Sequence, residues 1–317
     1  MVRYVVKRLA AAIPIFIGIT IIVYTLVSIA PGGPLDIINS AGSLSAEDLQ
    51  QLKVSMGLDK PILVRYLIWL RDLVTGDLGV SYRTNQSVAT MISLRIVPSL
   101  ILTLTGTTLA ILIGVPLGVL SAYRPYSPID TLSSGLAFIG TSAPGFFISL
   151  VSVYIFAAKL KILPAQGMYS TETGKSLSSL LLHLLLPACV VALQSVGGYI
   201  KQTRGSVLEV LNEDYIKTAR SKGLRETAIV IRHALRNALI PIVTLIGLSV
   251  PYMIGGAVVT EQIFSWPGIG SLMILSINNR DYPVIMGITV LISVTVLSAN
   301  ILLDLIYASL DPRISYQ

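Results

Sequence analysis

The sequence predicts an all-α membrane protein with six transmembrane helices. Of its 317 residues, 53% are hydrophobic and 12% are charged, which is about half the charged fraction of an ordinary soluble protein. Six windows contain no Asp, Glu, Lys or Arg, and each reaches the roughly 20 residues that a helix needs to cross a bilayer. These windows are residues 9–30, 96–122, 131–158, 176–200, 237–260 and 282–303. The composition therefore excludes an ordinary soluble fold.

Basic residues predict which side of the membrane each loop occupies. Arg3, Lys7 and Arg8 precede the first window, and positive charge favours the cytoplasmic side. An even number of crossings then places both termini in the cytoplasm. The segments assigned to that side hold 13 of the 23 Lys and Arg residues: 1–8, 122–130, 201–236 and 308–317. Loop 201–236, between the fourth and fifth helices, carries eight of them and gives the strongest support.

Segment 31–96 is expected to form a helical insertion on the outer side, between the first two transmembrane helices. Ser45, followed three residues later by an acidic residue, predicts a helix start, and Gly57 a stop. A second helix is expected from Pro61 to Gly76. The segment can cap the helix bundle or help to receive an external partner.

Small residues and prolines within the windows predict close packing and interrupted helices. Gly114 and Gly118 form a small-xxx-small step, which allows two helices to approach closely. Four prolines are expected to interrupt backbone hydrogen bonding: Pro116, Pro187, Pro241 and Pro251.

Patterns for enzymatic or metal chemistry are weak, so we predict no catalytic residue, no metal site and no cofactor in this chain. Gly174-Lys175-Ser176 resembles the end of a phosphate-binding loop, but Tyr169 stands where that loop needs glycine. His183 and His233 have no second ligand at metal-binding spacing. An intramembrane hydrolase with His183 as its base is an alternative, but the sequence contains no nucleophile motif that would support it. The chain is therefore expected not to be an enzyme.

Charge is also absent where an ion-coupled carrier would need it. Such carriers usually keep an ionisable group near the middle of the membrane, whereas here only Asp304, at the inner edge of the last window, comes close. An external energy source is therefore favoured. A self-sufficient secondary carrier or channel for a small solute stays open as the alternative, since backbone carbonyls can also bind a coupling ion.

Loop 201–236 has the pattern of a short amphipathic helical hairpin divided at Gly223. Its second half contains an apolar stripe of Leu224, Ala228, Ile231 and Leu235. A basic stripe of Arg225, Arg232 and Arg236 runs beside it, and Glu213 and Lys217 have the spacing of a helical ion pair. Such a hairpin suits docking into the groove of a partner protein or contact with anionic membrane lipid.

Four segments resemble one family of membrane proteins. Residues 214–224 (Asp-Tyr-Ile-Lys-Thr-Ala-Arg-Ser-Lys-Gly-Leu), continued by 232–238, resemble the EAA loop of ABC importer permeases in their peptide and nickel branch. Residues 8–32, 66–79 and 261–270 are similar to the B-type subunit of dipeptide and oligopeptide importers. Lys217, Thr218 and Arg236 depart from the general EAA pattern, which favours the peptide and nickel branch over sugar or amino-acid permeases.

The resemblance implies a single transmembrane permease domain over residues 1–317, located in the inner or plasma membrane. Its implied partners are a second homologous permease, two ATPase subunits that bind ATP, an extracytoplasmic substrate-binding protein and membrane lipid, with no nucleic acid. Its implied cargo is a dipeptide, an oligopeptide, nickel or a related small solute. Loop 213–236 would couple the permease to the ATPases.

Two sets of site residues follow from this resemblance and from the polarity of the windows. The expected ATPase-coupling residues are Glu213, Asp214, Thr218, Ala219, Arg220, Gly223, Leu224, Arg225, Arg232 and His233. Ala219 and Gly223 are expected to be small so that the hairpin can seat closely on an ATPase. The expected substrate path is lined by uncharged polar residues: Thr103, Thr107, Ser142, Gln194, Ser249 and Asn300.

Overall fold

The chain folds as a set of α-helices. The computed structural model describes residues 2–39, 44–170 and 174–310. Within these ranges the backbone forms helices, connecting loops and two isolated β-bridges, one between Val80 and Ser87 and one between Ser170 and Gly174. The predicted all-α class is confirmed for the described residues.

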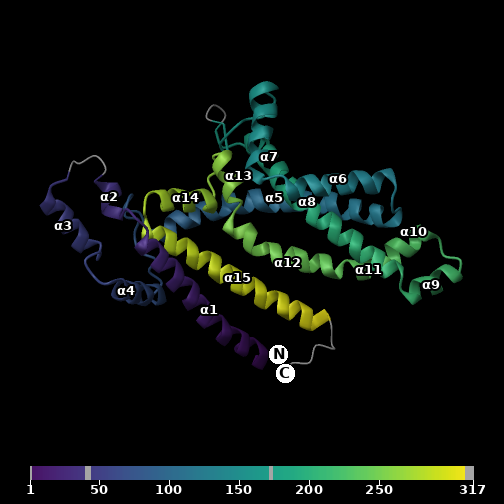
Figure 1. Cartoon of the computed structure of the whole chain (residues 1–317), viewed down its shortest axis with the longest axis horizontal. Helices are drawn as coiled ribbons and strands as arrows, with labels where there is room; N and C mark the ends of the chain where they lie inside the picture. Colours follow the sequence, from purple (N-terminus) through teal and green to yellow (C-terminus); the bar gives the residue numbers. More distant parts are fainter. Residues whose placement is uncertain (1, 40–43, 171–173, 311–317) are drawn as a thin grey trace. The chain divides into compact units, whose positions relative to one another are not determined.

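In the part of the chain that the structure describes, four helices are long and apolar enough to cross a membrane without a break. They are α1 (Val2–Ile29), α5 (Val88–Tyr123), α8 (Leu177–Leu211) and α15 (Tyr282–Leu310). Each overlaps one of the predicted windows (Figure 1), but α5 begins before its window and α8 continues through residues 201–211, which were predicted to start the cytoplasmic loop. The described residues also include two bent helix pairs, which raise the number of spans to as many as six.

The third window is not one straight helix, which corrects the prediction for residues 131–158. Helix α6 (Pro128–Ser142) is followed by α7 (Gly145–Ser152), which continues as a π-helical segment, η1 (Val153–Lys159); the two arms are bent by 105°. The break lies at Pro144, which has no amide hydrogen to donate and forces Ala143 into an extended conformation. Pro187, by contrast, lies inside the continuous helix α8.

The fifth window is also shorter than predicted. Helix α11 (Leu235–Ala238) leads into α12 (Ile240–Gly255), which stops at Gly256, whose φ is +81°. Glycine adopts this left-handed conformation without a steric penalty and commonly ends a helix. The rest of the window belongs to a separate short helix, α13 (Val258–Ile263).

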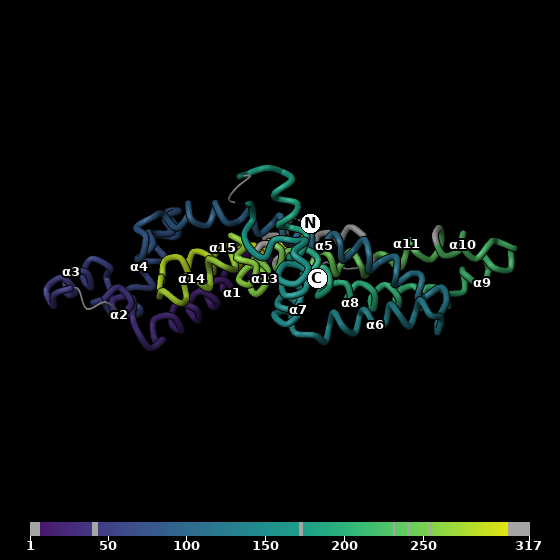
Figure 2. Tube along the Cα trace, turned by 90° about the horizontal axis from the view of Figure 1, so that it is seen from above, coloured from purple at the N-terminus to yellow at the C-terminus, as the bar shows by residue number. Residues whose placement is uncertain are grey.

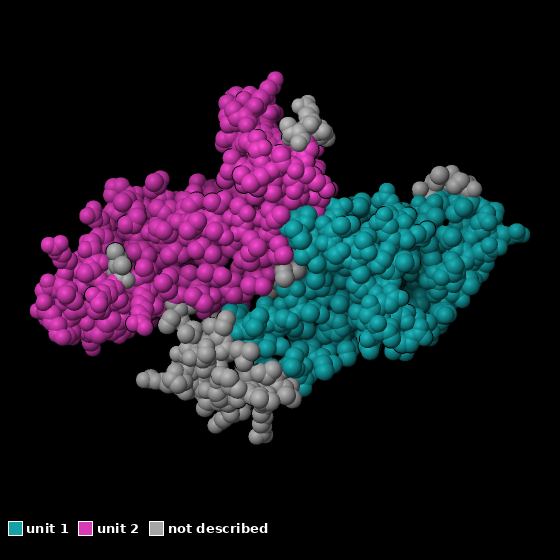
Figure 3. Space-filling model, turned by 180° about the vertical axis from the view of Figure 1, so that it is seen from behind, with its two compact units in different colours: residues 1–98, 268–317 teal, residues 99–267 magenta. Residues whose placement is uncertain are grey.

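The backbone groups into two compact units (Figure 3): residues 1–98 with 268–317, and residues 99–267. In the first unit, α1 and α15 pack side by side, and α14 (Ile269–Asn278) packs on α15 (Figure 1). An apolar cluster joins α14 and α15 to the start of α5; it includes Val88, Ile92, Ile269, Leu272, Val284 and Ile288. The side chain of Asp281 accepts hydrogen bonds from Ser81 Oγ and from the amide of Tyr82, so it ties loop 77–87 to the start of α15.

The predicted helices of segment 31–96 are confirmed. Helix α2 (Pro34–Ile38) precedes α3 (Ala46–Ser55), where Ser45 Oγ accepts a hydrogen bond from the amide of Asp48 at 3.1 Å. Helix α4 (Ile62–Val74) starts after Pro61. Its expected apolar face is only partly covered, because Tyr66 is buried while Leu63, Leu67 and Val74 are exposed.

Helix α8 is the packing centre of the second unit, and glycines let its neighbours come close. A Cβ atom on Gly118 of α5 would lie 2.8 Å from the carbonyl oxygen of Ile200, and one on Gly114 would lie 2.7 Å from the Cβ of Tyr199. This confirms the close approach predicted from the small-xxx-small step. On the α6 side, a Cβ on Gly140 would lie 2.2 Å from the carbonyl oxygen of Leu193.

A buried ion pair fixes the start of α6 to α8. Arg204 donates two hydrogen bonds to the carboxylate of Asp130, at 2.8 and 3.0 Å, and the amide of Tyr126 donates a third at 2.9 Å. The Asp130 side chain is only 7% exposed and that of Arg204 is 31% exposed.

We expect Asp130→Asn to destabilise the purified protein by about 3 kcal/mol, because Arg204 then loses its charged partner in a partly desolvated site. Thermal unfolding in detergent measures the loss. Asp214→Asn is the matched control, since the Asp214–Lys217 pair is exposed to solvent and such pairs contribute at most about 1 kcal/mol. Equal effects of the two substitutions would contradict the prediction.

Candidate coupling hairpin and polar cavity

The predicted hairpin is built from four short helical segments at the end of α8. Helix α9 (Asp214–Ser221) is followed by a turn at Gly223, then by α10 (Glu226–Ala228), a π-helical segment, η2 (Ile229–Ala234), and α11. Figures 1 and 2 both show α9, α10 and α11 together at one end of the second unit. Gly223 has a φ of +75°, so the division predicted there is confirmed.

The hairpin has its own apolar core. Ile216 and Ala219 of α9 and Ile229 and Ala234 of η2 are buried against one another, with Val210 and Leu211 of α8 packed on them. This cluster joins the two arms of the hairpin to the last turn of α8. The expectation that Ala219 is small in order to seat against an ATPase is therefore revised, because Ala219 faces the inside of the hairpin.

The buried face of the second arm differs from the predicted apolar stripe. Leu224 is 44% exposed and Ala228 is exposed, whereas Ile229 and Ala234 are buried. A π-helical turn joins residues five apart, so the buried positions recur at 229 and 234 and not at the α-helical spacing assumed for the stripe. The side chain of Ile231 lies outside the described residues.

Most of the expected coupling residues lie on the outside of the hairpin. Exposed are Glu213, Asp214, Thr218, Arg220, Gly223, Leu224, Arg225 and Arg232, while His233 is half-buried. Arg220 pairs with Glu226 across the turn at 2.7 Å. Lys217 pairs with Asp214 at 2.8 Å and not with Glu213 as predicted, because Glu213 precedes α9 and has an extended backbone conformation.

Basic side chains dominate the exposed surface of the hairpin. Lys222, Arg225, Arg232 and Arg236 are exposed, and the ion pairs found among the described residues do not include them. These guanidinium and ammonium groups can therefore contact an acidic protein surface or anionic lipid headgroups. Leu224 and Ala228 add apolar area to the same exposed surface.

One further contact holds the hairpin together and another joins it to the helix bundle, and sequence reasoning missed both. The Asn237 side-chain amide donates a hydrogen bond to the Tyr215 hydroxyl at 2.8 Å and so links α11 to α9. Ala238 packs with Ala122 of α5 and Val207 of α8 in a small buried cluster. This cluster joins α11 of the hairpin to α5 and α8.

The predicted substrate-path residues do not form one group. Thr103 and Thr107 are buried, and Thr103 donates hydrogen bonds to the carbonyl oxygens of Ser99 and Met253. Ser142 and Asn300 are exposed, and Asn300 belongs to the other compact unit.

Gln194 and Ser249, by contrast, meet in a cavity of about 340 Å³, which we call the polar cavity. Its lining is Gln194, Ser195, Tyr199, Leu245, Ser249 and Tyr252. The side-chain amide nitrogen of Gln194 is buried without a hydrogen-bond partner, beside Gly145 of α7. Sequence reasoning missed Ser195, Tyr199 and Tyr252, although helical spacings of four (195 to 199) and three (249 to 252) put them on shared helix faces.

The described residues contain no group of three or more His, Cys, Asp or Glu side chains that could hold a metal ion. The Nδ1 atom of His183 donates a hydrogen bond to the carbonyl oxygen of Ser179 at 2.8 Å, within α8.

Several apolar helices that are long enough to cross a membrane define a multi-pass membrane protein. Residues 114–316 match the family of binding-protein-dependent transport system inner membrane components, and residues 1–103 match the N-terminal region of the same membrane components. The chain belongs to this family. It is therefore a multi-pass inner-membrane component of an ABC transport system and not an enzyme.

Relatives resemble the chain over its whole length. It is 43% identical to a putative peptide permease protein of Brucella suis over 316 residues, which cover 99% of each chain. It is 42% identical to the oligopeptide transport system permease protein AppB of Bacillus subtilis, with 100% of each chain covered. Identity to the dipeptide transport system permease protein DppB of Escherichia coli is 35%, again over 100% of each chain.

Proposed function

We propose that this chain is the transmembrane permease subunit of an ATP-driven importer of dipeptides, oligopeptides or a related small solute. It forms the translocation path together with a second, homologous permease. Two ATPase subunits bind and hydrolyse ATP, and an extracytoplasmic binding protein delivers the substrate. The family and the names of the related peptide permeases support this assignment.

The observation that carries the coupling role is the construction of the hairpin. Its arms share a buried core with the end of α8, and Ala238 joins that end to α5. A rigid element of this kind moves its attached helices when a partner moves it. Its exposed basic surface, with Leu224 at the turn, fits a helix-in-groove contact with the ATPase subunits.

In this proposal, closure of the ATPases around ATP displaces the hairpin, and the hairpin tilts the helices that are attached at residues 200 and 237. The path then changes from inward-facing to outward-facing. Rigid-body movement of packed helices is a common form of such transitions, and closure steps of this kind often limit turnover. This chain supplies the conformational change, while the partner subunits supply the ATP chemistry.

The domain organisation that we propose is a single permease domain over residues 1–317, with both termini and loop 201–236 in the cytoplasm. The polar cavity is the part of the substrate path that the packing of this chain favours. Gln194 and the tyrosines and serines around the cavity provide an uncharged polar lining. Such a lining can pass peptides of different side chains because it does not recognise any one of them.

The coupling role predicts that Gly223→Trp abolishes peptide uptake by the assembled transporter in proteoliposomes while membrane insertion stays normal. The new side chain adds bulk at the exposed turn and is strained at a φ of +75°. We expect uptake to fall at least tenfold, with ATP hydrolysis continuing. Gly223→Asn is the matched control, since Asn tolerates this conformation, and it should retain most of the uptake.

Normal uptake by the Gly223→Trp transporter would contradict the docking of this turn on the ATPases. The alternative of a self-sufficient carrier is tested with the purified chain alone in liposomes. Accumulation of a solute without any ATPase subunit would refute the proposed function. Peptide cleavage that depends on His183 would refute it in favour of an enzyme.

A further inference from the structure

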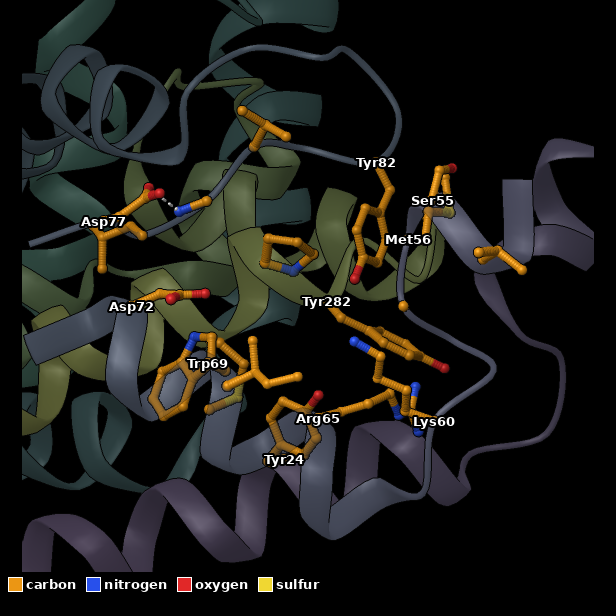
Figure 4. Close-up of a pocket in the computed structure, with 18 residues that line it drawn as sticks. Tyr24, Ser55, Met56, Lys60, Arg65, Trp69, Asp72, Asp77, Tyr82 and Tyr282 are labelled. Atoms are coloured by element: carbon orange, nitrogen blue, oxygen red, sulfur yellow. Dashed lines mark hydrogen bonds between the residues drawn. The ribbon is translucent and has the colours of Figure 1, made fainter. Parts of the chain in front are cut away.

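The first compact unit contains a cavity of about 420 Å³ that the proposed coupling role does not use (Figure 4). We call it the tyrosine pocket. Among the side chains that line it are Tyr24 of α1, Lys60, Arg65, Trp69 and Asp72 at and near α4, Asp77 and Tyr82 of the following loop, and Tyr282 of α15. All belong to one unit, and the volume falls within the range of small-molecule sites.

Two hydrogen-bond donors in this pocket lack acceptors. The Nε atom of Arg65 and the indole nitrogen of Trp69 are both buried and have no hydrogen-bond partner. The ion pairs found among the described residues also do not include Arg65. Buried donors are nearly always satisfied in folded proteins, so the orphaned Nε atom of Arg65 favours an acceptor oxygen at the end of the pocket that holds Arg65, while Trp69 lies at the end that holds Asp72 (Figure 4).

The charges in the pocket are separated. In Figure 4, Arg65 and Lys60 lie on one side, and Asp72 and Asp77 lie on the other. Arg71 bonds to Oδ1 of Asp72 at 2.7 Å, and the amide of Gly79 bonds to Oδ1 of Asp77 at 2.8 Å. The second oxygen of each carboxylate makes no such bond among the described residues, so both carboxylates can still accept a hydrogen bond from a cation.

Aromatic rings form the walls between these charged ends. Tyr24 and Trp69 pack with Tyr66, at ring-centroid distances of 5.6 and 5.8 Å from it, on one side of the pocket. Tyr82 and Tyr282 pack together at 6.2 Å. Burial raises the pKa of the Tyr82 phenol to about 12, so this hydroxyl stays protonated and can donate a hydrogen bond at physiological pH. Rings of this kind bind apolar side chains and also the positive charge of an ammonium group.

We propose that the tyrosine pocket binds a short zwitterionic peptide, with its carboxylate on Arg65 and Lys60 and its ammonium group at Asp72 and Asp77. Aromatic walls between the two charged ends accept side chains without strict selection. The choice of a peptide, and not another zwitterion, rests on the proposed function. The pocket is then a second peptide site, apart from the polar cavity, in the segment predicted to lie on the outer side.

Tryptophan fluorescence of the purified full-length chain tests this proposal, because Trp69 lines the pocket. The chain has two tryptophans, and the second, Trp266, is fully buried in the other unit. The probe is the dipeptide Ala-Phe. We expect a saturable change in fluorescence that survives Trp266→Phe and disappears in Trp69→Phe. The C-terminal amide and the N-acetyl form of the dipeptide should each bind at least tenfold more weakly.

Arg65→Gln should also weaken binding of Ala-Phe at least tenfold. Arg83→Gln is the matched control, since Arg83 is exposed in the same segment and does not line the pocket, and it should bind as the unchanged chain does. If Arg65→Gln disturbs folding, Tyr82→Phe provides a second, milder variant with weaker binding.

Three results would overturn the inference. The first is no change in fluorescence with millimolar Ala-Phe, and the second is equal binding of the dipeptide and its amide. The third is a change in Trp69 fluorescence when peptide-free binding protein is added but not when the dipeptide is added. ATP-dependent uptake is measured separately on the assembled transporter. Uptake without dipeptide binding by the isolated chain would refute only this inference. Dipeptide binding without ATP-dependent uptake would support it and refute the proposed function.

Discussion

Gly140→Ala is expected to destabilise the protein by about 3 kcal/mol and to lower its thermal unfolding midpoint in detergent by about 6 °C or more. The new Cβ atom would lie 2.2 Å from the carbonyl oxygen of Leu193 on α8. A backbone atom cannot rotate away as a side chain can, so α6 and α8 must separate. The same contact surface contains Gly197, whose Cβ would lie 2.6 Å from the carbonyl oxygen of Ala137.

Gly135→Ala is the matched control on the same helix. No atom lies within 4 Å of the position that its Cβ would take, and alanine is favoured over glycine within a helix by about 0.5–1 kcal/mol. This variant should be unchanged or slightly more stable. If both variants unfold at the same temperature, the close packing of α6 on α8 is not an important source of stability.

Ile216→Ala is expected to unfold the coupling hairpin locally and thereby to stop uptake. Ile216 is fully buried in the core between α9 and η2, and removing such a side chain costs about 3 kcal/mol. The amides of residues 214–238 should then exchange with solvent about 100-fold faster, since 1.4 kcal/mol corresponds to a factor of ten if opening is local. Hydrogen exchange measured by mass spectrometry on the purified chain reports this directly.

Thr218→Ala is the control for the hairpin, because Thr218 is exposed on the same helix. It should leave exchange within about twofold of the unchanged chain. Slow exchange in Ile216→Ala, together with normal uptake, would show that the hairpin does not depend on its internal core. Fast exchange with normal uptake would show that a rigid hairpin is unnecessary for transport.

Local features of the fold could be predicted because they depend on a few neighbouring residues. Ser45 and Gly57 mark the ends of α3, since a side-chain cap and a left-handed glycine act within one turn of a helix. Gly223 divides the hairpin for the same reason. The apolar windows located the long helices because membrane-crossing length is a matter of composition alone.

The break at Pro144 was not predicted, although the residues that cause it are visible in the sequence. Four other prolines were expected to interrupt helices, yet α8 continues through Pro187. A proline inside a helix always removes one backbone hydrogen bond. The residues that pack around the proline decide whether the helix then bends. At Pro144 the chain turns by 105°, and a Cβ atom on the adjacent Gly145 would lie 2.8 Å from the Gln194 side chain.

The candidate site was predicted as a segment, and its internal arrangement was not. Ala219 was expected on the docking surface but lies in the core of the hairpin. The apolar stripe assumed α-helical spacing, and the π-helical register moved the buried positions to Ile229 and Ala234. Whether a residue of the second arm is buried or exposed depends on how that arm packs against the first. The period of one type of helix does not determine this packing.

By itself, the sequence determined that this protein crosses a membrane several times, where its long helices lie, and that a basic hairpin separates two of them. Those properties follow from composition, charge and local backbone preference. Only the tertiary structure brought Gln194 to Ser249 in the polar cavity, and Tyr24, Arg65, Tyr82 and Tyr282 to one pocket. Such sites depend on which distant helices pack together, and that choice is made by the combined packing of many side chains.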